Sequence, residues 1–299
     1  MATHIPVALN RCVELLSVSI SKSNSPVAVD ATLGLGGHSA LLLSTFPNLK
    51  LIAIDRDPTA IEIAKERLAK FESRITYVNK TYDLIDEAIA QLNLPAVNAI
   101  LFDLGVSSMQ LDQAQRGFSY SQTAPLDMRM NPQHGQSAAA LLSKVTETKL
   151  AALLKENADE PRAVRLARAI MQTQQRTPIE STRALADVVR DALDQTDCDE
   201  DEIVLSIRRV FQALRIAVND EFGALDSLLS QIPHCLRPGG RVAILTFHSG
   251  EDRRVKQAFK AGLAAGVYSS VTDTVIRATP EEQHSNPRSA PAKLRFAVR

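Results

Sequence analysis

A glycine-rich turn between an apolar run and a helical segment constrains the fold of this chain more than any other feature. The nine residues of Asp30–His38 are Asp-Ala-Thr-Leu-Gly-Leu-Gly-Gly-His, and they follow the β-type run Pro26–Val29. Residues Ser39–Ser44 then begin a predicted helix. In a strand–turn–helix unit, backbone N–H groups can closely approach a nucleotide, because glycine has no side chain. The segment therefore predicts an α/β fold with a nucleotide-type ligand at the end of the first strand.

A second acidic residue supports this ligand site. Asp55 follows the predicted strand Leu49–Ile54 and lies 21 residues after Gly34. A carboxylate at this place can accept hydrogen bonds from the hydroxyl groups of a ribose. We therefore expect an adenosine-type cofactor at the carboxyl ends of a parallel sheet.

The glycine spacing indicates which cofactor this is. The order Gly34-x-Gly36-Gly37 differs from the G-x-G-x-x-G of dinucleotide sites, where a pyrophosphate faces a helix N-terminus. Asp30, at the end of the first strand, suits a cationic amino group better than a pyrophosphate. S-adenosylmethionine has an ammonium group, a sulfonium and no phosphate, so the pattern favours it. For the glycines alone, a plain tight turn is the alternative.

Composition is that of an ordinary globular protein, with 45% hydrophobic and 23% charged residues in 299. The chain shows no secretory signal and no apolar run long enough to span a membrane, so we expect a cytoplasmic protein. Cys12, Cys198 and Cys235 are far apart, which fits reduced thiols. The histidines have no zinc-type spacing, and G-x-S-x-G is absent. Neither a metal site nor a serine hydrolase is therefore expected.

The net charge is zero, but the charge is unevenly distributed. Residues 226–299 hold eleven Lys and Arg against six Asp and Glu, whereas residues 1–225 hold 23 against 28. The basic C-terminal part could face nucleic acid phosphates. Alternatively, it only balances the acidic run Asp197–Glu202.

The first half of the chain alternates predicted strands and helices, which indicates a doubly wound, Rossmann-like parallel sheet. The predicted strands are Val27–Thr32, Leu49–Ile54, Ile75–Asn79, Asn98–Asp103, Arg241–Phe247 and Lys293–Arg299, with a helix at Pro58–Ala69. A turn is expected at Leu236–Gly240 and a loop at Thr279–Pro291.

A long, mostly helical stretch separates the fourth predicted strand from the fifth. Its predicted helices are Lys149–Asn157, Ala163–Gln172, Thr182–Leu193 and Ile203–Ile232, the last divided near Gly223. A crossover needs far fewer residues. We therefore expect a methyltransferase-type sheet domain from residues 1–110 and 216–299, and an inserted helical substrate-recognition domain from residues 111–215.

Two strand ends carry candidate catalytic residues. Asp103 ends the fourth strand and is followed by Leu104 and Gly105, so its carboxylate lies beside the glycine turn at the topological switch point. His248 follows the fifth strand on the same rim. Asp103 is a candidate for positioning the cofactor or the acceptor, and His248 for steering or proton removal. Their structural alternatives are a turn-capping aspartate and a packed histidine.

These motifs together resemble those of the bacterial small-subunit (16S) rRNA cytosine-N4 methyltransferases. The resemblance runs from His4 to the end of the chain. The motifs that carry it are D-A-T-L-G-L-G-G-H-S, A-I-D-R-D-P, D-L-G-V-S-S-x-Q-L-D, R-G-F-S-Y, P-L-D-M-R-M, F-Q-A-L-R-I-A-V-N-D-E, L-R-P-G-G-R, F-H-S and N-P-R-S…K-L-R. It implies a class I methyltransferase sheet with an inserted helical domain.

The resemblance also implies a cofactor, a substrate and a site. The cofactor would be S-adenosylmethionine, and the substrate a cytidine of 16S rRNA in the decoding centre of the small ribosomal subunit. The implied cofactor contacts are Gly36, Gly37 and His38 with the methionine portion, Asp55 with the ribose, Tyr82 with the adenine region, and Asp103 and Gln110. Another RNA, a protein or a small molecule as acceptor remains an alternative, as does a non-catalytic ribosome assembly factor. The oligomeric state stays open, a homodimer included.

Two positions depart from the family pattern. Gly250 replaces the leucine of F-H-S-L-E-D, and Leu205–Val210 replaces a His-Pro-Ala-Thr-like lead. The first would loosen the rim loop, and the second would alter RNA contacts. Candidate base-stacking residues are Phe118 and Tyr120. Candidate phosphate contacts are Arg208, Arg209, Arg215, Arg253, Arg254 and Lys256.

Overall fold

The computed structural model describes residues 6–106, 113–194 and 196–299, which form two compact units. One comprises Met1–Gly105 with Phe222–Arg299, and the other Val106–Glu221. We call them the sheet unit and the helical unit. Their boundaries lie within a few residues of the domain boundaries expected from the sequence.

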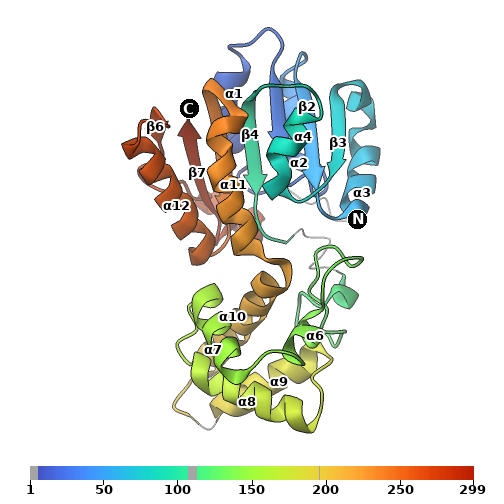
Figure 1. Cartoon of the computed structure of the whole chain (residues 1–299), viewed down its shortest axis with the longest axis vertical. Coiled ribbons are helices and arrows are strands. Elements are labelled where there is room, and N and C mark those ends of the chain that lie inside the picture. Colours follow the sequence, from blue (N-terminus) through green and yellow to red (C-terminus); the bar gives the residue numbers. More distant parts are fainter. Residues whose placement is uncertain (1–5, 107–112, 195) are drawn as a thin grey trace. The chain divides into compact units, whose positions relative to one another are not determined.

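The sheet unit holds a seven-stranded sheet in the order β3-β2-β1-β4-β5-β7-β6, in which β7 runs antiparallel to β5 and β6 (Figure 1). The strands are β1 (Val27–Asp30), β2 (Lys50–Asp55), β3 (Ile75–Asn79), β4 (Val97–Asp103), β5 (Leu236–Thr246), β6 (Ser270–Val271) and β7 (Lys293–Val298). The order in which strands are added reverses at β1, which pairs in parallel with β2 on one side and with β4 on the other. This topology confirms the predicted doubly wound, class I methyltransferase fold.

Helices cover both faces of the sheet because its central strands are apolar on both sides. On one face pack α1 (Leu9–Ile20), α2 (Gly37–Thr45) and α3 (Pro58–Leu68). On the other pack α4 (Ile85–Ala90), α11 (Glu221–Cys235) and α12 (Ser249–Ala264). The short α13 (Pro280–Ser285) and the 3₁₀ turns η1 (Ala69–Arg74), η2 (Tyr82–Leu84) and η4 (Pro287–Ser289) complete this unit.

The helical unit has its own apolar core, which a separate set of amphipathic helices encloses. These helices are α6 (Ala138–Leu142), α7 (Glu147–Ala158), α8 (Ala163–Arg176), α9 (Thr182–Asp194) and α10 (Glu200–Asn219), with the 3₁₀ turn η3 (Ala114–Arg116). No helix within the described ranges is long and apolar enough to cross a membrane.

The break expected near Gly223 is confirmed, and it lies three residues earlier at Asp220, which has a left-handed φ of 48°. Two other local predictions were wrong. The turn expected at Leu236–Gly240 is part of β5, since Leu236 already pairs with Val97 across a register irregularity. The loop expected at Thr279–Pro291 contains α13, which Thr279 caps by accepting the Glu282 N–H.

Candidate functional site

The glycine turn adopts a conformation that other residues rarely accept. Gly34 and Gly36 have φ values of 50° and 73°, and Gly36 is the N-cap of α2. A Cβ atom on Gly37 would lie 2.2 Å from Cγ of Pro6, and one on Gly36 would lie 3.0 Å from Leu68. The turn therefore depends on glycine both for its dihedral angles and for close packing.

Asp30 stabilises this turn from beneath. Its carboxylate accepts hydrogen bonds from the Ser39 hydroxyl at 2.6 Å and the Thr32 N–H at 3.3 Å. The residue is only 1% exposed, and both of its carboxylate oxygens accept hydrogen bonds within the turn. Burial raises the pKa of Asp30 to about 6.

Asp55 connects the glycine turn to the next strand–helix turn. One carboxylate oxygen accepts the Gly34 N–H and the other the Asp57 N–H, both at 2.8 Å. Asp57 in turn caps α3 by accepting the Thr59 N–H, and Pro58 follows at a position where helices tolerate proline. Burial raises the pKa of Asp55 to about 6. Asp55, which is predicted to contact the ribose, thus also holds the backbone of both turns in place.

Asp103 lies at the carboxyl end of β4 beside His38. Its N–H donates to the Thr32 hydroxyl at 2.6 Å, and its Oδ2 lies 3.7 Å from Nδ1 of His38. Its Oδ1 is buried and has no hydrogen-bond partner among the residues that the structure describes. Burial, with the charges of Asp30 and Glu251, raises the pKa of Asp103 to about 8.

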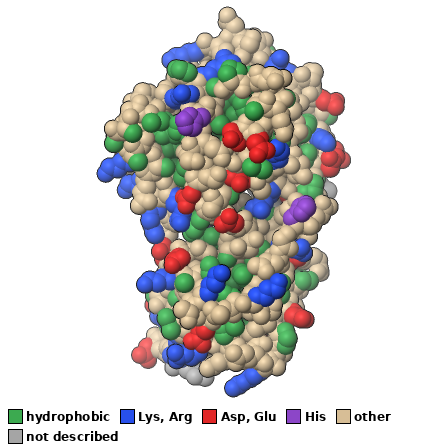
Figure 2. All heavy atoms as spheres, in the orientation of Figure 1, with side chains coloured by type: hydrophobic (Ala, Val, Ile, Leu, Met, Phe, Trp, Pro, Cys, Tyr) green, Lys and Arg blue, Asp and Glu red, His purple; other side chains and the backbone are tan. Residues whose placement is uncertain are grey.

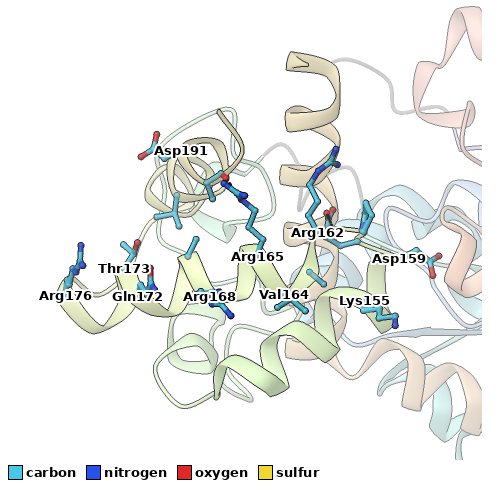
Figure 3. A pocket seen from close by; sticks show the side chains of 16 residues that line it. Lys155, Asp159, Arg162, Val164, Arg165, Arg168, Gln172, Thr173, Arg176 and Asp191 are labelled. Atoms are coloured by element: carbon cyan, nitrogen blue, oxygen red, sulfur yellow. Dashed lines mark hydrogen bonds between the residues drawn. The ribbon is translucent and has the colours of Figure 1, made fainter. Parts of the chain in front are cut away.

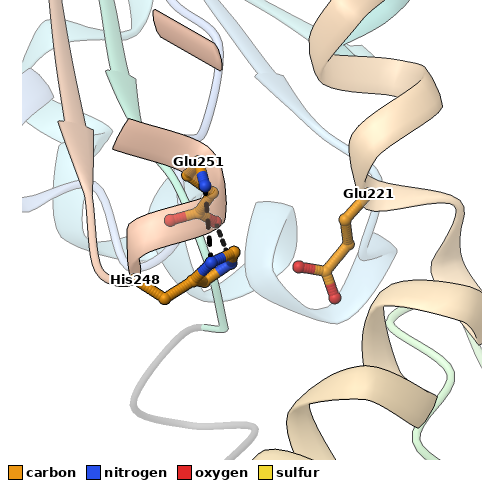
Figure 4. Close-up of side chains that lie close together, drawn as sticks. All are labelled: Glu221, His248 and Glu251. Atoms are coloured by element: carbon orange, nitrogen blue, oxygen red, sulfur yellow. Dashed lines mark hydrogen bonds and ion pairs between the residues drawn. The ribbon is translucent and has the colours of Figure 1, made fainter. Parts of the chain in front are cut away.

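His248 begins α12 rather than standing free on the rim. Its Nδ1 accepts the Glu251 N–H at 3.4 Å, while Glu251 accepts the Phe247 N–H at 2.8 Å. This reciprocal arrangement is a capping box in which histidine takes the usual place of serine or threonine. Nε2 of His248 lies 3.2 Å from the Glu251 carboxylate (Figure 4). Nδ1 is thus engaged by Glu251, whereas Nε2 is buried and makes no hydrogen bond within the described residues.

Tyr82 and Gln110 are the remaining residues predicted to contact the cofactor. Tyr82, in η2, packs edge-on against Phe102 with ring centroids 6.2 Å apart, so it lies close to the strand that ends in Asp103. Gln110 lies outside the described residues. Sequence reasoning missed the roles of Thr32 and Ser39, which hydrogen-bond to Asp103 and Asp30, and of Glu251, which contacts His248. Glu251 could have been found as the fourth residue of a capping-box pattern that begins at His248.

Several motifs prove to build the helical unit. The Asn219 side chain accepts the Met130 N–H and donates to the Met128 carbonyl, both at 2.8 Å. The Arg116 guanidinium donates to the Met130 carbonyl at 2.8 Å. Buried backbone groups of this kind need such partners. The R-G-F-S-Y, P-L-D-M-R-M and A-V-N-D-E motifs therefore form one packed region.

The residues proposed for stacking and phosphate contact also have neighbours within their own unit. Tyr120 packs edge-on against Phe211, and Phe118 lies against the same core. Arg215 pairs with Glu221 at 2.8 Å, and Arg209 lies 3.9 Å from the buried Glu160. In the sheet unit, Arg254 stacks 3.7 Å above the Phe222 ring. These contacts give most of these side chains a structural role.

Comparison with known proteins gives full-length matches. The model of the MraW methylase family matches residues 1–299. "Ribosomal RNA small subunit methyltransferase H" of Streptomyces avermitilis is 41% identical over 310 residues, covering 99% of this chain and 96% of the relative. The protein of the same name from Mycolicibacterium gilvum is 44% identical over 306 residues, covering 98% and 82%.

Among solved structures, an rRNA methylase from Streptococcus thermophilus aligns with 99% of both chains at a TM-score of 0.45 and 11% identity. The family assignment depends on the sequence matches, which extend over the whole chain. This protein belongs to the MraW methylase family.

Proposed function

We propose that this protein transfers a methyl group from S-adenosylmethionine to the exocyclic N4 amine of a cytidine in 16S rRNA, at the decoding centre of the small ribosomal subunit. The names of the relatives support small-subunit rRNA as the substrate. The cytidine, its N4 atom and its place in the decoding centre follow from the motif resemblance.

The observation that carries the proposal is a group of carboxylates around the glycine turn. Asp30, Asp55, Asp103 and Glu251 all lie at or beside the carboxyl ends of β1, β2, β4 and β5. Burial, with smaller contributions from neighbouring carboxylates, raises the pKa of the first three, so a bound cation would favour their ionised forms. The buried, unpartnered Oδ1 of Asp103 also calls for a donor. A cationic cofactor fits both requirements.

The residues proposed to hold the cofactor are those that the motif resemblance implies. The turn at Gly36 and Gly37, with His38, would bind the methionine portion, and Asp55 the ribose. Tyr82 would lie against the adenine, and Asp103 and Gln110 would complete the site. When bound, S-adenosylmethionine supplies an electrophilic methyl group on a positively charged sulfur.

The acceptor sets the remaining chemical demands. The cytosine amine is a weak nucleophile because its lone pair is delocalised into the ring. The protein must therefore hold it in a near-attack position and offer a hydrogen-bond acceptor as positive charge develops. Asp103 can accept such a hydrogen bond once its proton has left. His248 would steer the rim through its cap on α12, and the base must leave its stack to enter the site.

The decisive experiment is transfer of labelled methyl groups to small ribosomal subunits from a strain that lacks this gene, followed by nucleoside mass spectrometry. A single N4-methylated cytidine is the expected product. Label on another nucleoside would refute the N4 assignment. Tight cofactor binding without any label on RNA would refute methyl transfer to rRNA.

A further inference from the structure

The outer face of α8 in the helical unit carries positive charge that the site described above does not use. Helix α8 has no acidic residue between Ala163 and Arg176. Its buried residues are Ala163, Leu166, Ala167 and Ile170, which occupy one side of the helix. Arg165, Arg168 and Arg176 fall on the opposite side, because residues three or four apart share a face.

These arginines line an open groove of about 1100 Å³ between α8 and neighbouring parts of the helical unit. Its charged residues comprise five basic and three acidic side chains. One of the acids, Glu160, is 2% exposed and turned inward, where it accepts the Arg162 N–H at 2.9 Å. The accessible charge of the groove is therefore mainly positive.

Most of this positive charge is available to a ligand. The side chains of Lys155 and Arg176 are exposed, and neither has an ion-pair or hydrogen-bond partner within the described part of the chain. The Arg168 side chain is 62% exposed, and its Nε lies 3.4 Å from the Glu147 carboxylate. An exposed ion pair of this kind contributes little stability in water. The Nε–H of Arg165 donates a hydrogen bond to the Ala192 carbonyl, which fixes the side chain. The terminal guanidinium nitrogens then remain available to a ligand.

The arrangement of these side chains indicates the kind of ligand. Figure 3 shows Arg162, Arg165, Arg168 and Arg176 spread along α8 instead of converging on one point. A helix of this length spans about 20 Å. On the face shown in Figure 2, basic and acidic side chains are interspersed, so a helix side with arginines and no acids differs from that mixture. Spaced cations suit a ligand with spaced anions, as in a nucleic acid backbone.

We infer that the α8 groove is a binding surface for the phosphate backbone of the substrate rRNA, with Lys155, Arg165, Arg168 and Arg176 as the contacting residues. This inference rests on the proposed function for the identity of the RNA. Phosphate contacts supply affinity and register without reading bases, so the groove would hold rRNA without taking part in methyl transfer.

Two double variants of the full-length protein test the inference. Arg168→Gln with Arg176→Gln removes two charges from the groove. Arg183→Gln with Arg190→Gln removes two from α9, where these arginines pair with Asp187 and Glu200 outside the groove lining. Both pairs lie at the surface of the same unit, and thermal melting checks that both variants fold.

The first measurement is the potassium dependence of binding to small ribosomal subunits lacking the modification, at fixed magnesium. The groove variant should lower the slope of log K against log salt by about 1 to 2, because each lost phosphate contact removes roughly 0.7 to 0.9. The α9 variant should keep the wild-type slope. Equal slopes in the groove variant and the wild type would overturn the inference.

Steady-state kinetics and a second probe separate the remaining outcomes. The groove variant should raise KM for subunits roughly tenfold, while kcat and cofactor affinity stay unchanged. If it weakens binding to subunits but not to protein-free 16S rRNA, the groove faces an acidic ribosomal protein and the inference is wrong. A wild type that binds rRNA through the groove without methylating it would refute the proposed function and leave this inference standing.

Discussion

The imidazole of His38 lies between the Val7 carbonyl and the carboxyl group of Asp103. Its Nε2 lies 3.1 Å from the Val7 oxygen, which can only accept, so the hydrogen of a neutral ring resides on Nε2. Nδ1 therefore presents a lone pair toward Asp103 at 3.7 Å. A protonated Asp103 suits that neighbour, in agreement with the pKa of about 8 that burial and nearby carboxylates cause.

Cofactor binding should release a proton from Asp103. In the free protein its pKa lies above the ordinary value of 3.8, so the carboxyl group is mostly protonated at pH 7. A bound cation favours the carboxylate and lowers this pKa. Affinity for S-adenosylmethionine should therefore rise between pH 6 and pH 8, and calorimetry at pH 7 in buffers of different ionisation enthalpy should detect release approaching one proton.

Two variants identify the source of that proton. Asp103→Asn should abolish the release at pH 7. Asp55→Asn should weaken binding but keep the release, because the pKa of Asp55, about 6, leaves little proton to lose at pH 7. Wild-type binding without proton exchange at pH 7 would contradict the assignment.

The free protein should also lose stability as pH rises toward 8. The unfolded chain ionises Asp103 near pH 3.8, whereas the folded chain resists ionisation up to about pH 8. A raised pKa of this kind contributes stability at low pH that is lost through that window. Urea unfolding should show that the free energy of unfolding falls less between pH 5 and pH 8 in Asp103→Asn than in the wild type. Identical pH dependence in the two proteins would rule out this contribution.

His248 should tolerate asparagine better than alanine. Asparagine can still accept the Glu251 N–H as an N-cap, whereas alanine cannot. We expect His248→Ala to lose about 1 kcal/mol of stability and His248→Asn much less. Turnover of His248→Asn should stay within about tenfold of the wild type, because the cap on α12 needs only an acceptor for the Glu251 N–H. A loss of 10²-fold or more would instead indicate proton transfer by the imidazole.

Gly250 should be coupled to Phe222. The residue departs from the leucine of the family pattern, and it lies buried in the first turn of α12 instead of loosening a loop. A Cβ atom there would lie 2.6 Å from Cζ of Phe222. Gly250→Ala should cost about 1–3 kcal/mol, and Phe222→Leu should relieve part of that cost. Additive effects in the double-mutant cycle would argue against the contact.

Two glycines of the helical unit provide a matched pair for backbone strain. Gly117 and Gly135 both have left-handed φ values, 73° and 80°. A Cβ on Gly117 would lie 2.4 Å from the Pro125 carbonyl oxygen, whereas one on Gly135 meets nothing within 4 Å. Gly135→Ala should cost about 1–2 kcal/mol through φ alone, and Gly117→Ala several kcal/mol. Similar unfolding midpoints for the two variants would contradict the packing of the R-G-F-S-Y motif against Pro125.

Sequence patterns predict the strands of the sheet and most helices between β4 and β5, and they place Asp55 and Asp103 at strand ends. Alternating apolar runs located β1 to β5 within a few residues, and Asp55 was recognised from its distance to the glycines. These features are local, since strand period, helix period and glycine turns leave their mark within a few residues. The sequence pattern does not predict α1 and α12, and the break near Gly223 lies three residues earlier because Asp220 ends α10 in a conformation usual for glycine.

Only the tertiary structure decided what the marked residues do. Asp30 supports the turn because Ser39 and Thr32 occupy its oxygens, and His248 caps a helix because Glu251 closes the box. Asn219 hydrogen-bonds to the backbone of Met128 and Met130, some ninety residues earlier in the chain. The raised pKa of Asp103 likewise depends on its burial and on the carboxylates of Asp30 in β1 and Glu251 in α12. Such roles arise from contacts between distant residues, and residue type and spacing do not encode which of several partners a side chain meets.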